Sequence, residues 1–105
     1  MIQQQWMSLL GLANRARKTI SGEELVVKEI QRGKAKLVIL SEDASSNTAK
    51  KITDKCNFYK VPLRYVNNRQ ILGQAIGKEE RVVVAILDNG FAVKLKSLLE
   101  NISRG

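Results

Sequence analysis

The sequence predicts an α/β fold in which helices cover both faces of a small sheet. Three short apolar runs alternate with segments whose apolar residues recur at helical spacing. The runs are rich in valine, isoleucine and leucine, as expected of strands that are buried on both sides. Strands that alternate with helices favour a parallel or mixed sheet. A chain of 105 residues that is 44% hydrophobic is sized for one core, so we expect residues 1–105 to form a single domain.

A first helix is predicted over residues 3–14, because apolar side chains recur there every three or four positions. The residues on its apolar side are Trp6, Leu9, Leu10 and Ala13. A basic connection follows, with Arg15, Arg17 and Lys18.

A second helix is predicted directly after Ser21. Residues 21–24 have the Ser-x-x-Glu form of a capping box, in which the Ser21 hydroxyl accepts from a helix amide and Glu24 reaches back. The residues expected to turn inward are Leu25, Val26, Val27 and Ile30. Arg32 falls in the last turn, and Gly33 provides the cap at the end.

The rest of the chain alternates strands and helices. Strands are predicted at 37–40, 61–66 and 82–87, and helices at about 47–58, 68–76 and 89–102. The final helix is expected to carry its apolar side on Phe91, Val93, Leu95, Leu98 and Leu99. The only cysteine, Cys56, has the spacing of a core residue and no partner for a disulfide, which is consistent with a reducing cytoplasm.

Charge indicates the class of partner. The formal net charge is +8, from 18 Lys and Arg against 10 Asp and Glu, which favours nucleic acid first and an anionic membrane surface second. Charge that serves only solubility is the alternative. Aromatic residues make up 5% of the chain and do not pair on one strand, which argues against a base-stacking sheet and favours structured RNA. No apolar run approaches the length of a membrane span, so no transmembrane segment is predicted; with nucleic acid as the favoured partner, no membrane partner is expected.

Catalysis, metals and cofactors are not expected. The chain has no histidine and one cysteine, which removes the usual nucleophile pairs and zinc sites. Residues 73–78 are similar to a Walker phosphate loop, but the spacing is one residue short and Glu79 stands where Ser or Thr would bind magnesium.

Basic residues concentrate in two stretches. The first holds Arg15, Arg17, Lys18, Lys28, Arg32, Lys34 and Lys36, and the second holds Lys50, Lys51, Lys55, Lys60, Arg64 and Arg69. Lys28 and Arg32 are four residues apart and therefore share a side of the second helix, whose amino end attracts phosphate. Simple solvation of that helix is an equally good interpretation of the two residues.

An ordered set of short motifs resembles the L-seven-Ae family of kink-turn RNA-binding proteins, most closely its small bacterial YlxQ-type branch. The matching pieces are Gly22 with Lys28 six residues later, Ile30, RGKAKLVI at 32–39, EDA at 42–44, VP at 61–62 and LGQAIG at 72–77. The resemblance implies a three-layer αβα sandwich around a four-stranded mixed sheet. It also implies a monomer that binds RNA with tandem sheared G·A pairs beside a sharp kink, in association with the ribosome.

The same resemblance implies roles for single residues. Gly22 lets the backbone approach RNA, Lys28 contacts a guanine edge and Arg32 contacts phosphate, while a loop after Gly77 covers a flipped-out nucleotide. The full set expected to bind RNA is Lys18, Gly22, Glu23, Glu24, Lys28, Arg32, Lys78 and Arg81, and the residues expected to support the loop are Gly73, Ala75 and Gly77.

Two departures from the family pattern predict an altered RNA preference. Glu24-Leu25 stands where archaeal members have Asn-Glu, and residues 78–81 replace apolar residues with Lys-Glu-Glu-Arg. A protein–protein adaptor on the same scaffold is the alternative function, and a small nucleotide-dependent enzyme is a third that lacks the necessary motifs.

Overall fold

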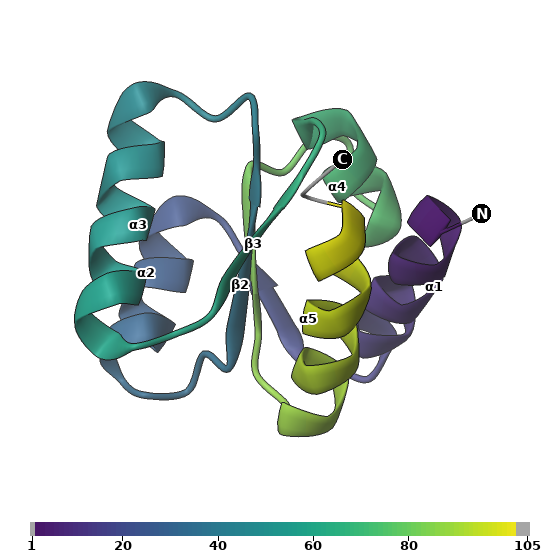
Figure 1. Ribbon diagram of the computed structural model, residues 1–105, viewed down its shortest axis with the longest axis horizontal. Coiled ribbons are helices and arrows are strands. Elements are labelled where there is room, and N and C mark those ends of the chain that lie inside the picture. The colour runs from purple at the N-terminus through teal and green to yellow at the C-terminus, as the bar shows by residue number, and fades with distance from the viewer. Residues whose placement is uncertain (1, 103–105) are drawn as a thin grey trace.

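Four strands form one mixed sheet at the centre of the computed structural model, which describes residues 2–102 (Figure 1). The strands lie in the order β1 (Thr19–Ser21), β4 (Val83–Ile86), β2 (Leu37–Ser41) and β3 (Leu63–Val66). β2 and β3 are parallel, whereas β4 runs antiparallel to both of its neighbours. The prediction of a four-stranded mixed sheet is confirmed.

Five helices cover the sheet as the outer layers of a three-layer sandwich. On one face lie α2 (Glu23–Gln31) and α3 (Ser46–Tyr59), and on the other lie α1 (Ile2–Arg15), α4 (Arg69–Ala75) and α5 (Asn89–Ile102) (Figure 1). The predicted helices are present, and the last has the predicted bounds. No helix among residues 2–102 is long and apolar enough to cross a bilayer.

The strands divide the core into two clusters, because successive side chains of a strand point to opposite faces. Leu37, Ile39, Val84 and Ile86 pack with residues of α1, α4 and α5, whereas Val38, Leu40, Val83 and Ala85 pack with residues of α2 and α3. Trp6 is only 1% exposed in the first cluster. Cys56 is buried in the second, as predicted.

The start of α2 differs from its prediction. Ser21 is the last residue of β1, a strand that the sequence did not reveal, and Gly22 is the N-cap. No side chain caps the helix, so the predicted capping box is wrong. The reason lies in the tertiary structure: β1 pairs with β4, and the Ser21 hydroxyl accepts a hydrogen bond from Arg81 instead.

Two apolar residues also differ from their prediction. Leu25 is 48% exposed on α2, and Val93 is 67% exposed on α5. In both helices other apolar positions face the sheet, with Val26 and Ile30 buried in α2 and Leu95 and Leu99 buried in α5.

Candidate nucleic-acid interface

The backbone is open where β1 meets α2. Gly22 has φ 100° and ψ 141°, a conformation that side-chain-bearing residues rarely adopt, and a Cβ there would meet nothing within 4 Å. Its amide donates to the Val83 carbonyl at 3.2 Å, and its carbonyl accepts from Val26 at 2.9 Å. A hollow of about 450 Å³ lies here, lined by Gly22, Glu23, Glu24 and Leu25. The uncapped first turn therefore presents free amides and the positive end of the helix dipole to solvent.

A second segment, the loop of residues 76–82 between α4 and β4, is anchored by Gly73. A Cβ at this position would lie 2.6 Å from the Glu79 carbonyl oxygen and 2.8 Å from the Glu80 Cα, so the loop backbone occupies the space that a side chain would need. The Gly73 carbonyl also accepts from the Lys78 amide at 2.8 Å. Ala75 is buried at the end of α4, and Gly77 makes the turn with φ 71°. The structure therefore places Gly73 against the loop backbone and Gly77 at the turn where the loop begins, whereas Ala75 is buried at the end of α4.

The Arg81 side chain joins the two segments. Its Nε donates to the Ser21 Oγ at 3.1 Å, and its Nη1 donates to the Glu80 carbonyl at 2.6 Å. Its amide donates to the Arg69 carbonyl at 3.1 Å. Because Ser21 directly precedes the open Gly22, the loop and the start of α2 form one continuous surface although they lie about 60 residues apart in the chain.

The two glutamates at the start of α2 have different surroundings. Both oxygens of Glu23 are engaged by α3: Thr48 Oγ1 donates to one at 2.7 Å, and Lys51 Nζ lies 2.9 Å from the other. The hydrogen bond from Lys51, and then that from Thr48, lowers the pKa of Glu23. Glu24 is exposed beside it. Of the two glutamates expected to bind RNA, Glu24 is therefore the more accessible one.

The predicted basic ligands lie along α2 and at the edges of the two segments. Lys28 is exposed one and a half turns after Gly22, and its side chain has no hydrogen bond or ion pair with any residue in the range 5–100. Arg32 is exposed at the end of the helix and approaches Glu29 at 3.4 Å. Lys18 and Lys78 are exposed on either side, before β1 and in the loop.

The second basic stretch of the sequence is largely paired with acids. Its ion pairs are Lys50 with Asp54, Lys51 with Glu23, Arg64 with Glu100 and Arg69 with Asp43. These partners neutralise much of the charge that the sequence appeared to offer there. Within residues 5–100, the lysines that keep no acidic partner include Lys28 of α2, Lys78 of the loop and Lys55 of the second stretch.

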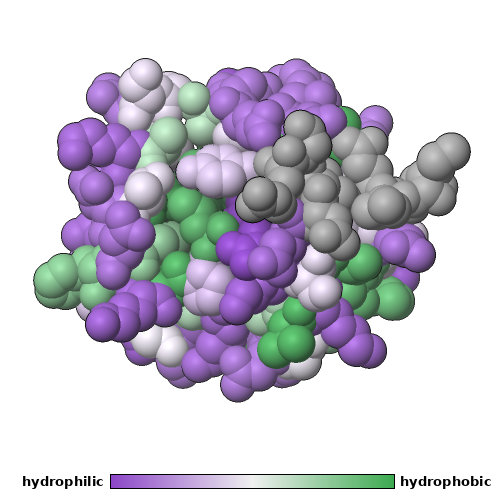
Figure 2. All heavy atoms as spheres, viewed as in Figure 1, coloured by the Kyte–Doolittle hydropathy of each residue, from purple (hydrophilic) through white to green (hydrophobic). Residues whose placement is uncertain are grey.

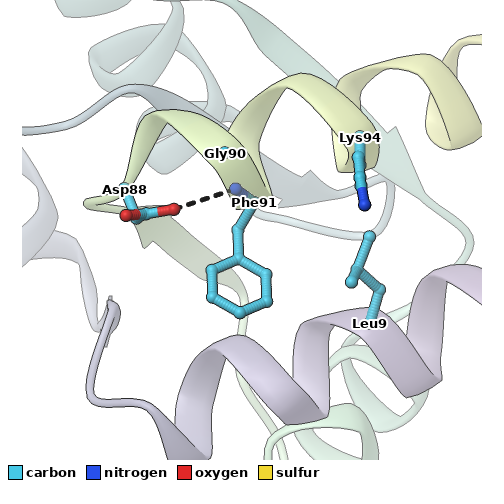
Figure 3. A pocket seen from close by; sticks show the side chains of 5 residues that line it. All are labelled: Leu9, Asp88, Gly90, Phe91 and Lys94. Carbon is cyan, nitrogen blue, oxygen red and sulfur yellow. Dashed lines mark hydrogen bonds between the residues drawn. The ribbon is translucent and has the colours of Figure 1, made fainter.

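A smaller hollow on the other side of the molecule lies outside this surface. It measures about 260 Å³ between α1 and α5 and is lined by Leu9, Asp88, Gly90, Phe91 and Lys94 (Figure 3). Asp88 accepts from the Phe91 amide at 3.0 Å, so its carboxylate caps α5. Within the described part of the chain, no group of three or more His, Cys, Asp or Glu side chains is arranged to hold a metal ion.

The sandwich and the joined segments define a small basic αβα domain with an open helix start beside a glycine-anchored loop. The model of the ribosomal protein L7Ae/L30e/S12e/Gadd45 family matches residues 4–96, and the chain belongs to this family.

Relatives and solved structures agree with this assignment. The chain is 68% identical over 96 residues to the RNA-binding protein YlxQ of Bacillus subtilis, covering 91% of this chain and 96% of the relative. It is 32% identical over 90 residues to the large ribosomal subunit protein eL8 of Thermoplasma volcanium, covering 85% and 74%. A Bacillus halodurans protein of unknown function superimposes with a TM-score of 0.89 at 55% identity, covering 91% and 97%. The Giardia lamblia 15.5kD RNA binding protein has the same fold, with a TM-score of 0.82 at 20% identity, covering 96% and 89%.

These comparisons confirm the predicted family and its small bacterial branch. The relatives are named as RNA-binding and ribosomal proteins and not as enzymes, which confirms the prediction of a non-enzymatic domain. The roles of the individual site residues stay predictions.

Proposed function

We propose that this protein binds structured RNA, and that its ligand is a kink-turn with tandem sheared G·A pairs. The observation that carries the proposal is the continuous surface in which Arg81 holds the loop of residues 76–82 against Ser21, beside the open backbone of Gly22. The names of the relatives support RNA as the partner. We further propose that the protein acts as a cytoplasmic monomer on ribosomal RNA.

The chemistry of the surface suits a kinked internal loop. Free amides at the start of α2 can donate to a phosphate or a base acceptor, and the helix dipole favours the negative charge. The ammonium of Lys28, which has no partner among residues 5–100, can donate to the O6 and N7 acceptors of guanine. A regular A-form helix hides these edges in a deep, narrow groove, whereas a kink exposes them. Lys28 therefore provides selectivity for the kinked form.

The departures from the family pattern are exposed on this same surface. Leu25 is half-exposed in the hollow at the start of α2 and offers an apolar contact where a polar one is expected. Glu23 is held by α3, which leaves Glu24 as the carboxylate that faces the ligand. We expect the RNA preference to differ from that of archaeal members at the bases beside these residues.

Binding of two RNAs of equal length tests the proposal. A kink-turn and a fully paired duplex are titrated with the protein in a gel shift, and the kink-turn is expected to bind more tightly. Lys28→Ala should weaken kink-turn binding by about 1–3 kcal/mol, and affinity should fall steeply with salt. Lys94→Ala is the matched control, because Lys94 lies on α5 in the opposite layer. Equal affinity for the kink-turn and the duplex would contradict the proposal.

A further inference from the structure

The outer face of α3 exposes an aromatic pair that the proposed interface does not use. Phe58 is 76% exposed, although phenylalanine is among the residue types most often buried. Its ring meets that of Tyr59 edge to face, with centroids 4.8 Å apart and planes at 74°. Two of the five aromatic residues of the chain therefore stand together on the surface.

A hollow of about 540 Å³ lies against this pair. Lys51, Asp54, Lys55, Phe58 and Tyr59 line it, and we call this group the α3 aromatic strip. Lys51, Lys55 and Phe58 are spaced by four and three residues, which places them on one side of the helix. In Figure 2 the side of the molecule that carries α2 and α3 is mostly hydrophilic, with a small hydrophobic patch at its margin.

The strip has a net positive charge. α3 contains three lysines and one acidic residue, Asp54, and Asp54 is paired with Lys50 at 3.2 Å. The side chain of Lys55 has no ion pair or hydrogen bond with any residue in the range 5–100. An aromatic face flanked by lysines matches a partner that has both flat apolar surfaces and regularly spaced anions.

The strip is continuous with the proposed RNA interface. Lys51 Nζ lies 2.9 Å from a carboxylate oxygen of Glu23, which is at the start of α2. From Lys51 to Phe58 the helix rises by about 10 Å. A strand that leaves the start of α2 therefore meets the lysines first and the aromatic rings next.

We propose that the α3 aromatic strip binds a single-stranded RNA segment that flanks the structured ligand, with a base stacked on Phe58 and a phosphate held by Lys55, while Lys51 stays paired with Glu23. The inference rests on the proposed function in taking the structured RNA to lie at the start of α2. Stacking on aromatic side chains tolerates any base, so this contact would extend affinity without demanding a sequence. The small size of the apolar patch and its lysine border favour RNA over a protein partner.

Three RNAs and four proteins test the inference. The RNAs are a blunt-ended kink-turn, the same kink-turn with a single-stranded extension at either end, and the extension alone. The proteins are the wild type, Phe58→Ala, Phe58→Trp and the control Val93→Ala, which removes an exposed apolar side chain from α5. Fluorescence anisotropy of labelled RNA measures each affinity.

The extension should strengthen wild-type binding roughly ten-fold. Phe58→Ala should lose that gain while binding the blunt kink-turn within about two-fold of the wild type, and Val93→Ala should keep the gain. Phe58→Trp should keep it too, and its added tryptophan fluorescence should be quenched by the extended RNA only. Phe58→Trp retains an aromatic ring and so tests the inference even if Phe58→Ala folds poorly.

Failure of the inference and failure of the proposed function give different results. A wild type that prefers the kink-turn to a duplex but gains nothing from any extension overturns the inference alone. Binding of the extension that depends on Phe58, without preference for the kink-turn, supports the inference and overturns the proposed function. A concentration-dependent dimer in sedimentation that Phe58→Ala abolishes would assign the strip to a second copy of the chain and overturn the inference.

Discussion

Replacing Gly73 with alanine should push the loop of residues 76–82 away from α4. The new Cβ would lie 2.6 Å from the Glu79 carbonyl oxygen, whereas ordinary contact begins at 3.4 Å, so this oxygen must move by about 0.8 Å (3.4 − 2.6). All three of the nearest atoms belong to the backbone of Glu79 and Glu80, and no side chain can rotate away to relieve the contact.

The magnitude follows from two opposing effects. Overpacking of this kind costs about 1–3 kcal/mol. Alanine inside a helix is favoured over glycine by about 0.5–1 kcal/mol, which offsets part of the cost. We therefore expect Gly73→Ala to lower the free energy of unfolding by about 1 kcal/mol, the middle of a range from about 0 to 2.5 kcal/mol, which shifts the urea midpoint by roughly 0.5 M.

Urea unfolding followed by tryptophan fluorescence measures this shift, because Trp6 is the only tryptophan and is 1% exposed in the core. Gly90→Ala is the comparison variant: its Cβ would approach one side-chain atom, the Asp88 oxygen that caps α5, at 3.2 Å, so its midpoint should fall less than that of Gly73→Ala. Gly73→Ala with a midpoint equal to or above that of the wild type would refute the close-packing argument.

Two further predictions concern ionisable groups. Burial raises the pKa of Cys56 to about 11, so only about one thiol in a thousand is ionised at pH 8. A thiol reagent should therefore modify the native protein far more slowly than the urea-unfolded protein. Equal rates would show that Cys56 is accessible in the native protein. Hydrogen bonds from Lys51 and then from Thr48 lower the pKa of Glu23 below its unfolded value of 4.5. A carboxyl of this kind stabilises the fold at pH values above its unfolded pKa. The stabilisation is lost as the pH falls through the folded pKa. Glu23→Gln should therefore be less stable than the wild type at pH 7, with a difference that shrinks at pH 3 in urea unfolding. A difference that is the same at both pH values would exclude a contribution from the ionised carboxylate.

Local patterns were sufficient to predict most of the elements. The apolar spacing of the final helix predicted its bounds, because amphipathic periodicity over fourteen residues is a strong signal. β1 was missed because three residues are too few to show an alternation, and because its pairing partner, β4, lies far along the chain. The sequence near Ser21 matched a capping box, but this local preference gave way to a hydrogen bond from Arg81.

The composition and motifs by themselves determined the class of this protein: a basic α/β domain of the L7Ae family without histidine and with a single cysteine. The tertiary structure alone decided which charged groups are accessible. Lys51 is the neighbour of a second lysine in the sequence but the partner of Glu23 in the fold, whereas Lys28 is unpaired within residues 5–100. It also decided that the start of α2 and the loop after Gly73 form one surface, because the contact between Arg81 and Ser21 depends on the pairing of β1 with β4, which no local pattern encodes.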